Sequence, residues 1–145
     1  MVAMRGQDMG KVVIEFTITN FGDRVLCEAG HLPADKVRQT RVKGIVDTGA
    51  AMLVLPESVS RHLGLPKNSE TKVRYADNRT AQRDIVEQAE VEILGRKNIF
   101  TAVVEPSRTD ALIGAIVLEA LDLIVDCKHQ KLEPRDPHQI LTEIE

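Results

Sequence analysis

The feature that most constrains the fold is the distribution of apolar residues, which occur in short runs rich in Val, Ile and Leu between turn residues. β-Branched side chains suit a pleated strand, and no long apolar stripe of helical period is present. Aromatic residues contribute little core, because the chain has no Trp, one Tyr and three Phe. Its 145 residues suit one domain. We therefore expect an all-β fold, a small closed barrel with one or two short helices.

The local patterns predict where the elements lie. Strands are expected at 11–19, 37–46, 52–55, 72–75, 80–93, 99–104, 123–127 and 130–132. The segment 20–23 has turn chemistry, so residues 24–28 are expected to return as the second arm of a hairpin. Helices are expected at 57–63, between Pro56 and Gly64, and at 115–121. The tail after residue 133 is expected to carry a further short helix at its end.

Charge and composition narrow the possible partners. The net charge of −3 is spread along the chain, and no block of Lys and Arg indicates nucleic-acid binding. No apolar stretch approaches the roughly 18 residues that span a membrane. Residues 1–10 have no apolar core typical of a signal peptide, so we expect a loose arm there and a cytoplasmic protein.

Histidine and cysteine spacing gives no sign of a metal or cofactor. The four His residues lack ligand spacing such as HxxxH, and Cys27 and Cys127 match no CxxC pattern. We expect no metal site and no cofactor. The two thiols are expected to be reduced and buried.

One short motif carries chemistry. Asp47-Thr48-Gly49-Ala50 follows the apolar pair Ile45-Val46 and precedes a second apolar run. Peptide hydrolysis needs a base to activate water and an acid to protonate the carbonyl oxygen or the leaving amine. Two carboxylates that share one proton can do both, a rule that aspartic proteases themselves exemplify. Thr48 can brace two facing loops, Gly49 allows close approach, and Ala50 keeps the floor of a cleft shallow.

A second motif strengthens the first. Ala111-Leu112-Ile113-Gly114 is followed by an expected helix, and a long hairpin lies between the two motifs. Together they resemble the signatures of retropepsin-like aspartic proteases, closest to the small bacterial and archaeal members. The resemblance implies an acid-protease barrel over residues 11–133 with a flap hairpin, an N-terminal arm at 1–10 and a C-terminal tail at 134–145. It also implies that Ile113 and Gly114 pack beneath the catalytic loop.

The chain contains a single Asp-Thr-Gly, which is half of a catalytic dyad. The resemblance therefore implies a homodimer in which each copy contributes Asp47, acting as an endopeptidase on extended peptides or unfolded proteins. The flap tip, with Tyr75, Ala76, Asp77 and Asn78, is expected to contact substrate; its sequence is not Gly-rich as in the viral enzymes. Ala51 and Ala115 replace an Asp and an Arg that pair in those enzymes.

Other interpretations remain open at this point. The chain could be a catalytically silent module of the same fold that binds peptides or mediates dimerisation. It could also be an unrelated β-barrel in which Asp47 is an ordinary turn carboxylate. Tyr75 could line the cleft or be a plain strand residue.

Overall fold

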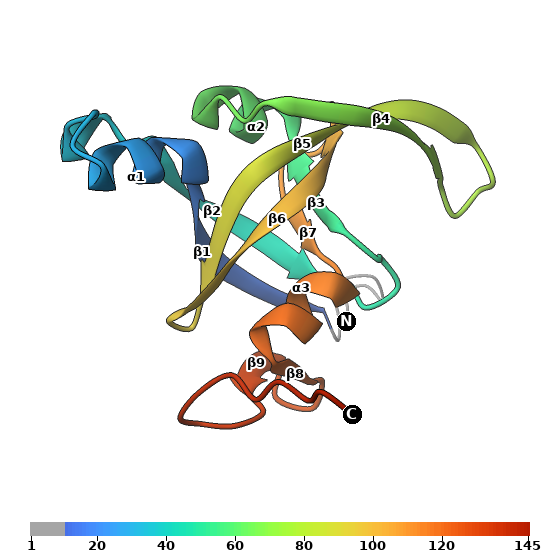
Figure 1. Ribbon diagram of the computed structural model, residues 1–145. Coiled ribbons are helices and arrows are strands. Elements are labelled where there is room, and N and C mark those ends of the chain that lie inside the picture. Colours follow the sequence, from blue (N-terminus) through green and yellow to red (C-terminus); the bar gives the residue numbers. More distant parts are fainter. Residues whose placement is uncertain (1–10) are drawn as a thin grey trace.

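The computed structural model describes residues 11–145, so the arm predicted at residues 1–10 lies outside the described residues. Six strands form a closed barrel in which each pairs with the next, and the last pairs with the first (Figure 1). In spatial order they are β1 (Val12–Asn20), β2 (Gln39–Val46), β7 (Ala111–Ile113), β3 (Leu53–Pro56), β6 (Arg96–Glu105) and β5 (Thr80–Ile93). The predicted all-β barrel is confirmed.

Strand β5 belongs to both the barrel and the flap. Its first half pairs with β4 (Lys67–Arg74) to form the long hairpin that extends from the barrel, and its residues Ala89–Glu92 pair with β1 (Figure 1). The register against β6 shifts between Val86 and Ala89, and Gln88 has a positive φ of 67°. A bulge of this kind bends a strand and strengthens its twist, so one strand can serve both structures.

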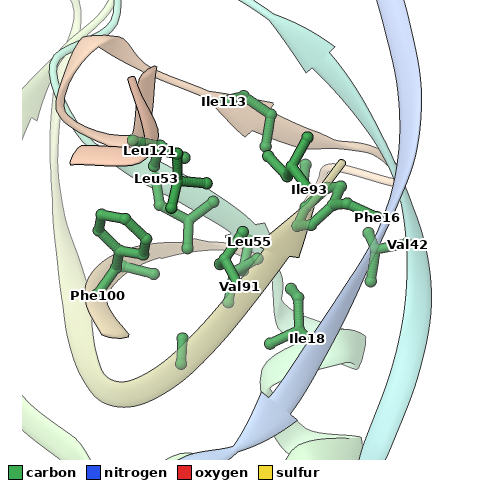
Figure 2. Close-up of a cluster of buried hydrophobic side chains, with 14 of the residues drawn as sticks. Phe16, Ile18, Val42, Leu53, Leu55, Val91, Ile93, Phe100, Ile113 and Leu121 are labelled. Carbon is green, nitrogen blue, oxygen red and sulfur yellow. The ribbon is translucent and has the colours of Figure 1, made fainter. Parts of the chain in front are cut away.

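The barrel is filled by aliphatic side chains with two phenylalanines among them (Figure 2). The strands place alternate residues inside, so that Phe16 and Ile18 of β1 are almost completely buried. Gly44 on the neighbouring β2 makes room for this packing, because a Cβ there would lie 2.7 Å from Cε1 of Phe16. Burial of each large side chain contributes roughly 1.5–3 kcal/mol to stability.

The described residues contain three α-helices, whereas one or two were predicted for the barrel and a further one for the tail. α2 (Glu57–Leu63) and α3 (Ala115–Leu121) have the predicted bounds, whereas α1 (Phe21–Glu28) replaces the predicted turn and strand at 20–28. Asn20 explains the error. Its side-chain oxygen accepts a hydrogen bond from Asp23 N at 2.9 Å, which caps a helix, and its amide donates to Leu63 O at 2.8 Å. A 3₁₀ turn, η1 (Ala34–Lys36), follows.

The C-terminal region packs beyond α3 as a separate hairpin of β8 (Leu123–Asp126) and β9 (Lys131–Pro134) (Figure 1). The helix expected in the tail is wrong, because residues 135–145 are irregular. The buried Asp122 carboxylate binds this segment: Arg135 Nε donates to Oδ1 at 2.6 Å and Leu141 N donates to Oδ2 at 3.0 Å. These hydrogen bonds to Asp122 hold the tail in place of the backbone hydrogen bonds that a helix would make.

Both cysteines are free, as expected for reduced thiols, but neither is buried. Cys27 is half-buried on α1 and Cys127 is exposed after β8. The prediction of burial was wrong because Cys27 lies on a short helix with one face in solvent and Cys127 lies in the turn that follows β8. Within residues 11–145, no helix is long and apolar enough to cross a membrane.

Candidate active site

Asp47 lies at the end of β2, where the chain leaves the barrel in a tight turn. Its backbone N–H donates to Ile113 O on β7 at 3.0 Å, and Ala50 N donates to Asp47 O at 3.1 Å. The side chain is exposed in the single chain. Gly49 N donates to Asp47 Oδ1 at 2.9 Å, so one carboxylate oxygen is held by the loop while the other has no hydrogen-bond donor among the described residues. The loop thus fixes the carboxylate and presents it outward.

The second motif lies directly against this loop. β7 pairs in parallel with β2, which places Val46 opposite Ile113. Ala115 N donates to Ala50 O at 2.8 Å and Ile116 N donates to Ala51 O at 3.0 Å. The first turn of α3 is therefore capped by carbonyls of the Asp47 loop, which satisfies N–H groups that a helix start leaves without partners.

Gly114 allows this close contact. An added Cβ would lie 2.4 Å from Met52 O and 2.7 Å from Ala50 O. Its φ of −86° is ordinary, so the requirement for glycine is steric and not conformational. The backbone of the two motifs touches at this residue.

The flap tip is a tight turn across residues 75–79. Tyr75 N donates to Arg79 O at 2.9 Å, Asn78 N donates to Tyr75 O at 2.9 Å, and Asn78 has a left-handed φ of 69°. Asp77 accepts hydrogen bonds from the Arg79 side chain at 2.8 Å and from its backbone N–H, and these lower the pKa of Asp77. Both side chains are exposed, so the pair contributes little stability.

Tyr75 connects the flap to the barrel. Its hydroxyl donates to Glu105 Oε2 at the end of β6, and Arg83 Nε donates to Glu105 Oε1 at 2.7 Å. The bond to Glu105 raises the pKa of Tyr75, since it requires the protonated phenol. The guanidinium of Arg79 lies 4.9 Å from the centre of the Tyr75 ring, a cation–π distance. Tyr75 thus holds the hairpin over the space beneath it.

A pocket of about 520 Å³ lies between the flap and the Asp47 loop. The pocket is walled by the Asp47 loop, by β4 and by the ends of β6 and β7. The residues that line it include Gly49, Ala50, Met52, Val73, Tyr75, Glu105, Arg108 and Leu112. A second hollow of about 350 Å³ lies at Asp47 and shares Arg108 and Leu112 with the first. The larger hollow of about 620 Å³ beside α1 includes none of the predicted site residues.

The structure thus brings most of the predicted site residues together. Asp47, Gly49, Ala50, Ile113 and Gly114 form one contiguous loop cluster, and the exposed Thr48 is part of the same turn. Tyr75 faces this cluster across the pocket, whereas Ala76, Asp77 and Asn78 are exposed at the tip and do not line it.

Sequence reasoning did not assign several wall residues to the site, among them Glu105, Arg108 and Leu112. Leu112 belongs to the second motif and could have been found from the pairing of strands β2 and β7. The other two carry no local signal. Among residues 11–145, no group of three or more metal-ligating side chains gathers.

Comparison with known proteins places this geometry in a family. Residues 36–120, more than half of the chain, match the family model described as "gag-polyprotein putative aspartyl protease". The chain belongs to this family of retroviral-type aspartyl proteases. The matched residues contain the Asp47 loop, the flap hairpin and the second motif, whereas β1 and α1 lie outside them.

Among solved structures, the chain is similar to the solution structure of the simian foamy virus (mac) protease. The identity is 18%, the TM-score is 0.44, and the match covers 55% of this chain and 81% of that chain. No curated protein matches the chain.

Proposed function

We propose that this protein is an aspartic endopeptidase whose active site forms between two copies of the chain. The observation that carries the proposal is Asp47, a carboxylate fixed at Oδ1 by the Gly49 N–H and presented outward, which lines one hollow while its own loop lines the flap pocket. Membership of an aspartyl protease family supports the reaction type.

The proposed chemistry needs two carboxylates, and Asp47 supplies one in each copy. A two-fold dimer places the same residue on both sides of its axis, so the partner's Asp47 supplies the second. The ionised member takes a proton from water, whose oxygen attacks the scissile carbonyl, and the protonated member donates to the carbonyl oxygen. The carboxyl that took the proton from water then gives it to the departing amine as the C–N bond breaks, and the other carboxylate takes a proton back from the diol, which becomes the product acid.

The substrate of the proposed enzyme is an extended peptide or an unfolded protein segment. β4 is an edge strand, and its residues line the same pocket as the Asp47 loop, so we propose that a strand-like peptide pairs between them. In this proposal Thr48, Gly49, Ala50, Ile113 and Gly114 support the catalytic loop, and the flap covers the substrate. The domain bounds 11–133 and a cytoplasmic location remain predictions from the sequence.

The test is cleavage of a denatured protein between about pH 4 and pH 7, the range in which such dyads share one proton. Asp47→Asn should abolish cleavage and leave a folded dimer by sedimentation equilibrium. The matched control is Asp35→Asn, an exposed carboxylate on η1, which should cleave at the wild-type rate. Cleavage by Asp47→Asn would refute the proposal, and a dimer without any product would favour the silent binding module.

A mixing experiment tests whether the site is shared. After subunit exchange with an equal amount of Asp47→Asn, half of the wild-type subunits sit in mixed dimers. Activity per wild-type subunit should therefore fall to roughly half. An unchanged activity would mean that each chain carries a complete site.

A further inference from the structure

Arg108 lies at the junction of the two hollows beside the Asp47 loop. The flap pocket and the Asp47 hollow share Arg108 and Leu112 in their walls. A side chain bound where the two hollows meet therefore lies next to these two residues. Leu112 is apolar, so the charge that a bound peptide meets at this junction is that of Arg108.

The Arg108 guanidinium is held in position, and no carboxylate of residues 11–145 neutralises its charge. The residue is half-buried in the loop between β6 and β7, where Arg108 N donates to Glu105 O and Arg108 Nε donates to Asp110 O at 2.8 Å. Within the part of the chain that the structure describes, no carboxylate lies within 4.0 Å of it. A carbonyl fixes the direction of the side chain without cancelling its charge, so the remaining N–H groups can bind an anion.

The other charged residues nearby leave an excess of positive charge around Arg108. Glu105 is the one carboxylate among the described residues of the flap-pocket wall, and it is already paired with Arg83 at 2.7 Å. Lys72 and Arg74 also border the pocket, but strand alternation puts their exposed side chains on the face of β4 opposite Tyr75. In the hollow at Asp47, the Lys11 cation and the Asp47 carboxylate oppose each other, so Arg108 supplies the remaining positive charge. The walls therefore favour an anionic group, although the whole chain has a net charge of −3.

We propose that Arg108 determines specificity and makes the cleft select peptides with an acidic side chain, glutamate above all, beside the scissile bond. The inference rests on the proposed protease function. A glutamate carboxylate bonds to the free guanidinium N–H groups, and its methylene groups pack on Leu112 and Met52 in the apolar part of the pocket. A Gln side chain has the same shape and lacks the charge.

The first experiment compares peptides that differ only in Glu, Gln or Lys beside a bond that the enzyme cuts in a denatured protein. Wild type should show a kcat/KM about tenfold higher for Glu than for Gln, the size of one charge-assisted hydrogen bond. Arg108→Gln should reduce this ratio to about one, and Arg108→Glu should favour Lys. Arg61→Gln, an exposed arginine on α2, is the matched control and should keep the wild-type ratio.

A binding measurement separates this inference from the proposed function. Fluorescence anisotropy of labelled Glu and Gln peptides is measured with Asp47→Asn and with the double variant Asp47→Asn/Arg108→Gln. Tighter binding of the Glu peptide that disappears in the double variant supports the inference even if wild type cuts nothing, in which case only the protease function fails. Equal binding of both peptides, or a Glu preference that survives loss of Arg108, overturns the inference and leaves the protease function standing.

Discussion

Gly114→Ala should lower the free energy of unfolding, because Gly114 lies where the two motifs touch. The added Cβ would lie 2.4 Å from Met52 O, 2.7 Å from Ala50 O and 2.9 Å from the carbonyl carbon of Ala51. Ordinary contact of a Cβ with another heavy atom begins at about 3.4 Å, so the loop or α3 must move by up to about 1 Å. All three neighbours are backbone atoms, which cannot turn away as a flexible side chain can.

The cost has two parts. Overpacking of a close contact costs about 1–3 kcal/mol. The movement also stretches the hydrogen bonds from Ala115 N to Ala50 O and from Ile116 N to Ala51 O, each worth about 1 kcal/mol. We expect the free energy of unfolding to fall by about 3–5 kcal/mol, a large share of the roughly 5–15 kcal/mol of a typical domain.

The assay is urea unfolding followed by far-ultraviolet circular dichroism, at one protein concentration because a dimer's stability depends on it. Gly30→Ala is the matched control: Gly30 has a φ of 83° and no heavy atom within 4 Å of an added Cβ, so its cost is backbone strain of about 1–2 kcal/mol alone. A Gly114→Ala variant no less stable than Gly30→Ala would refute the reasoning. Its cleavage rate should also fall at a temperature where both variants remain folded.

Three further predictions concern the rest of the chain. Asn20→Ala removes a buried helix cap and should lower the free energy of unfolding by about 2 kcal/mol in urea titrations, and a loss under half of that would count against the cap. The bond from Leu141 N–H holds the pKa of Asp122 below its usual value, so Asp122 stabilises the fold above about pH 4 and loses this effect as the pH falls through its lower folded pKa. Asp122→Asn should therefore lower the urea midpoint at pH 7 and change it little near pH 2; an equal loss at both would contradict the charge argument. Tyr75→Phe removes the hydrogen bond to Glu105, and hydrogen exchange at the flap should quicken with a loss of stability under about 1.5 kcal/mol, whereas unchanged exchange would show that the bond does not hold the hairpin.

The sequence predicted the parts of the fold that depend on local signals. Pro56 and Gly64 mark the two ends of α2, and Gly64 does adopt the left-handed conformation, with φ of 62°, that ends a helix. The strands along the chain followed from short apolar and β-branched runs, and the long hairpin followed from the turn residues Asp77 and Asn78 between two of them. The Asp47 loop was found because its motif is contiguous and its neighbours have defined chemical roles.

The parts that were missed depend on contacts between distant residues. Asn20 suits a turn and a helix cap equally well, and what favours the helix is its bond to Leu63 O and the binding of Asp23 by Arg38. Arg108 lies in an unremarkable loop, and only the parallel pairing of β7 with β2 brings it beside Asp47. Such contacts have no signature in a single sequence.

The dual pairing of β5 makes the flap inseparable from the barrel wall. A hairpin joined at its base by two independent strands can be shortened or exchanged as a unit, but here the strand that carries the tip also closes the sheet through Ala89–Glu92 against β1. A deletion or graft that shifts β5 by an odd number of residues would turn its inward side chains toward solvent. We therefore expect natural and engineered changes in flap length to be matched insertions in β4 and β5, on the tip side of Gln88.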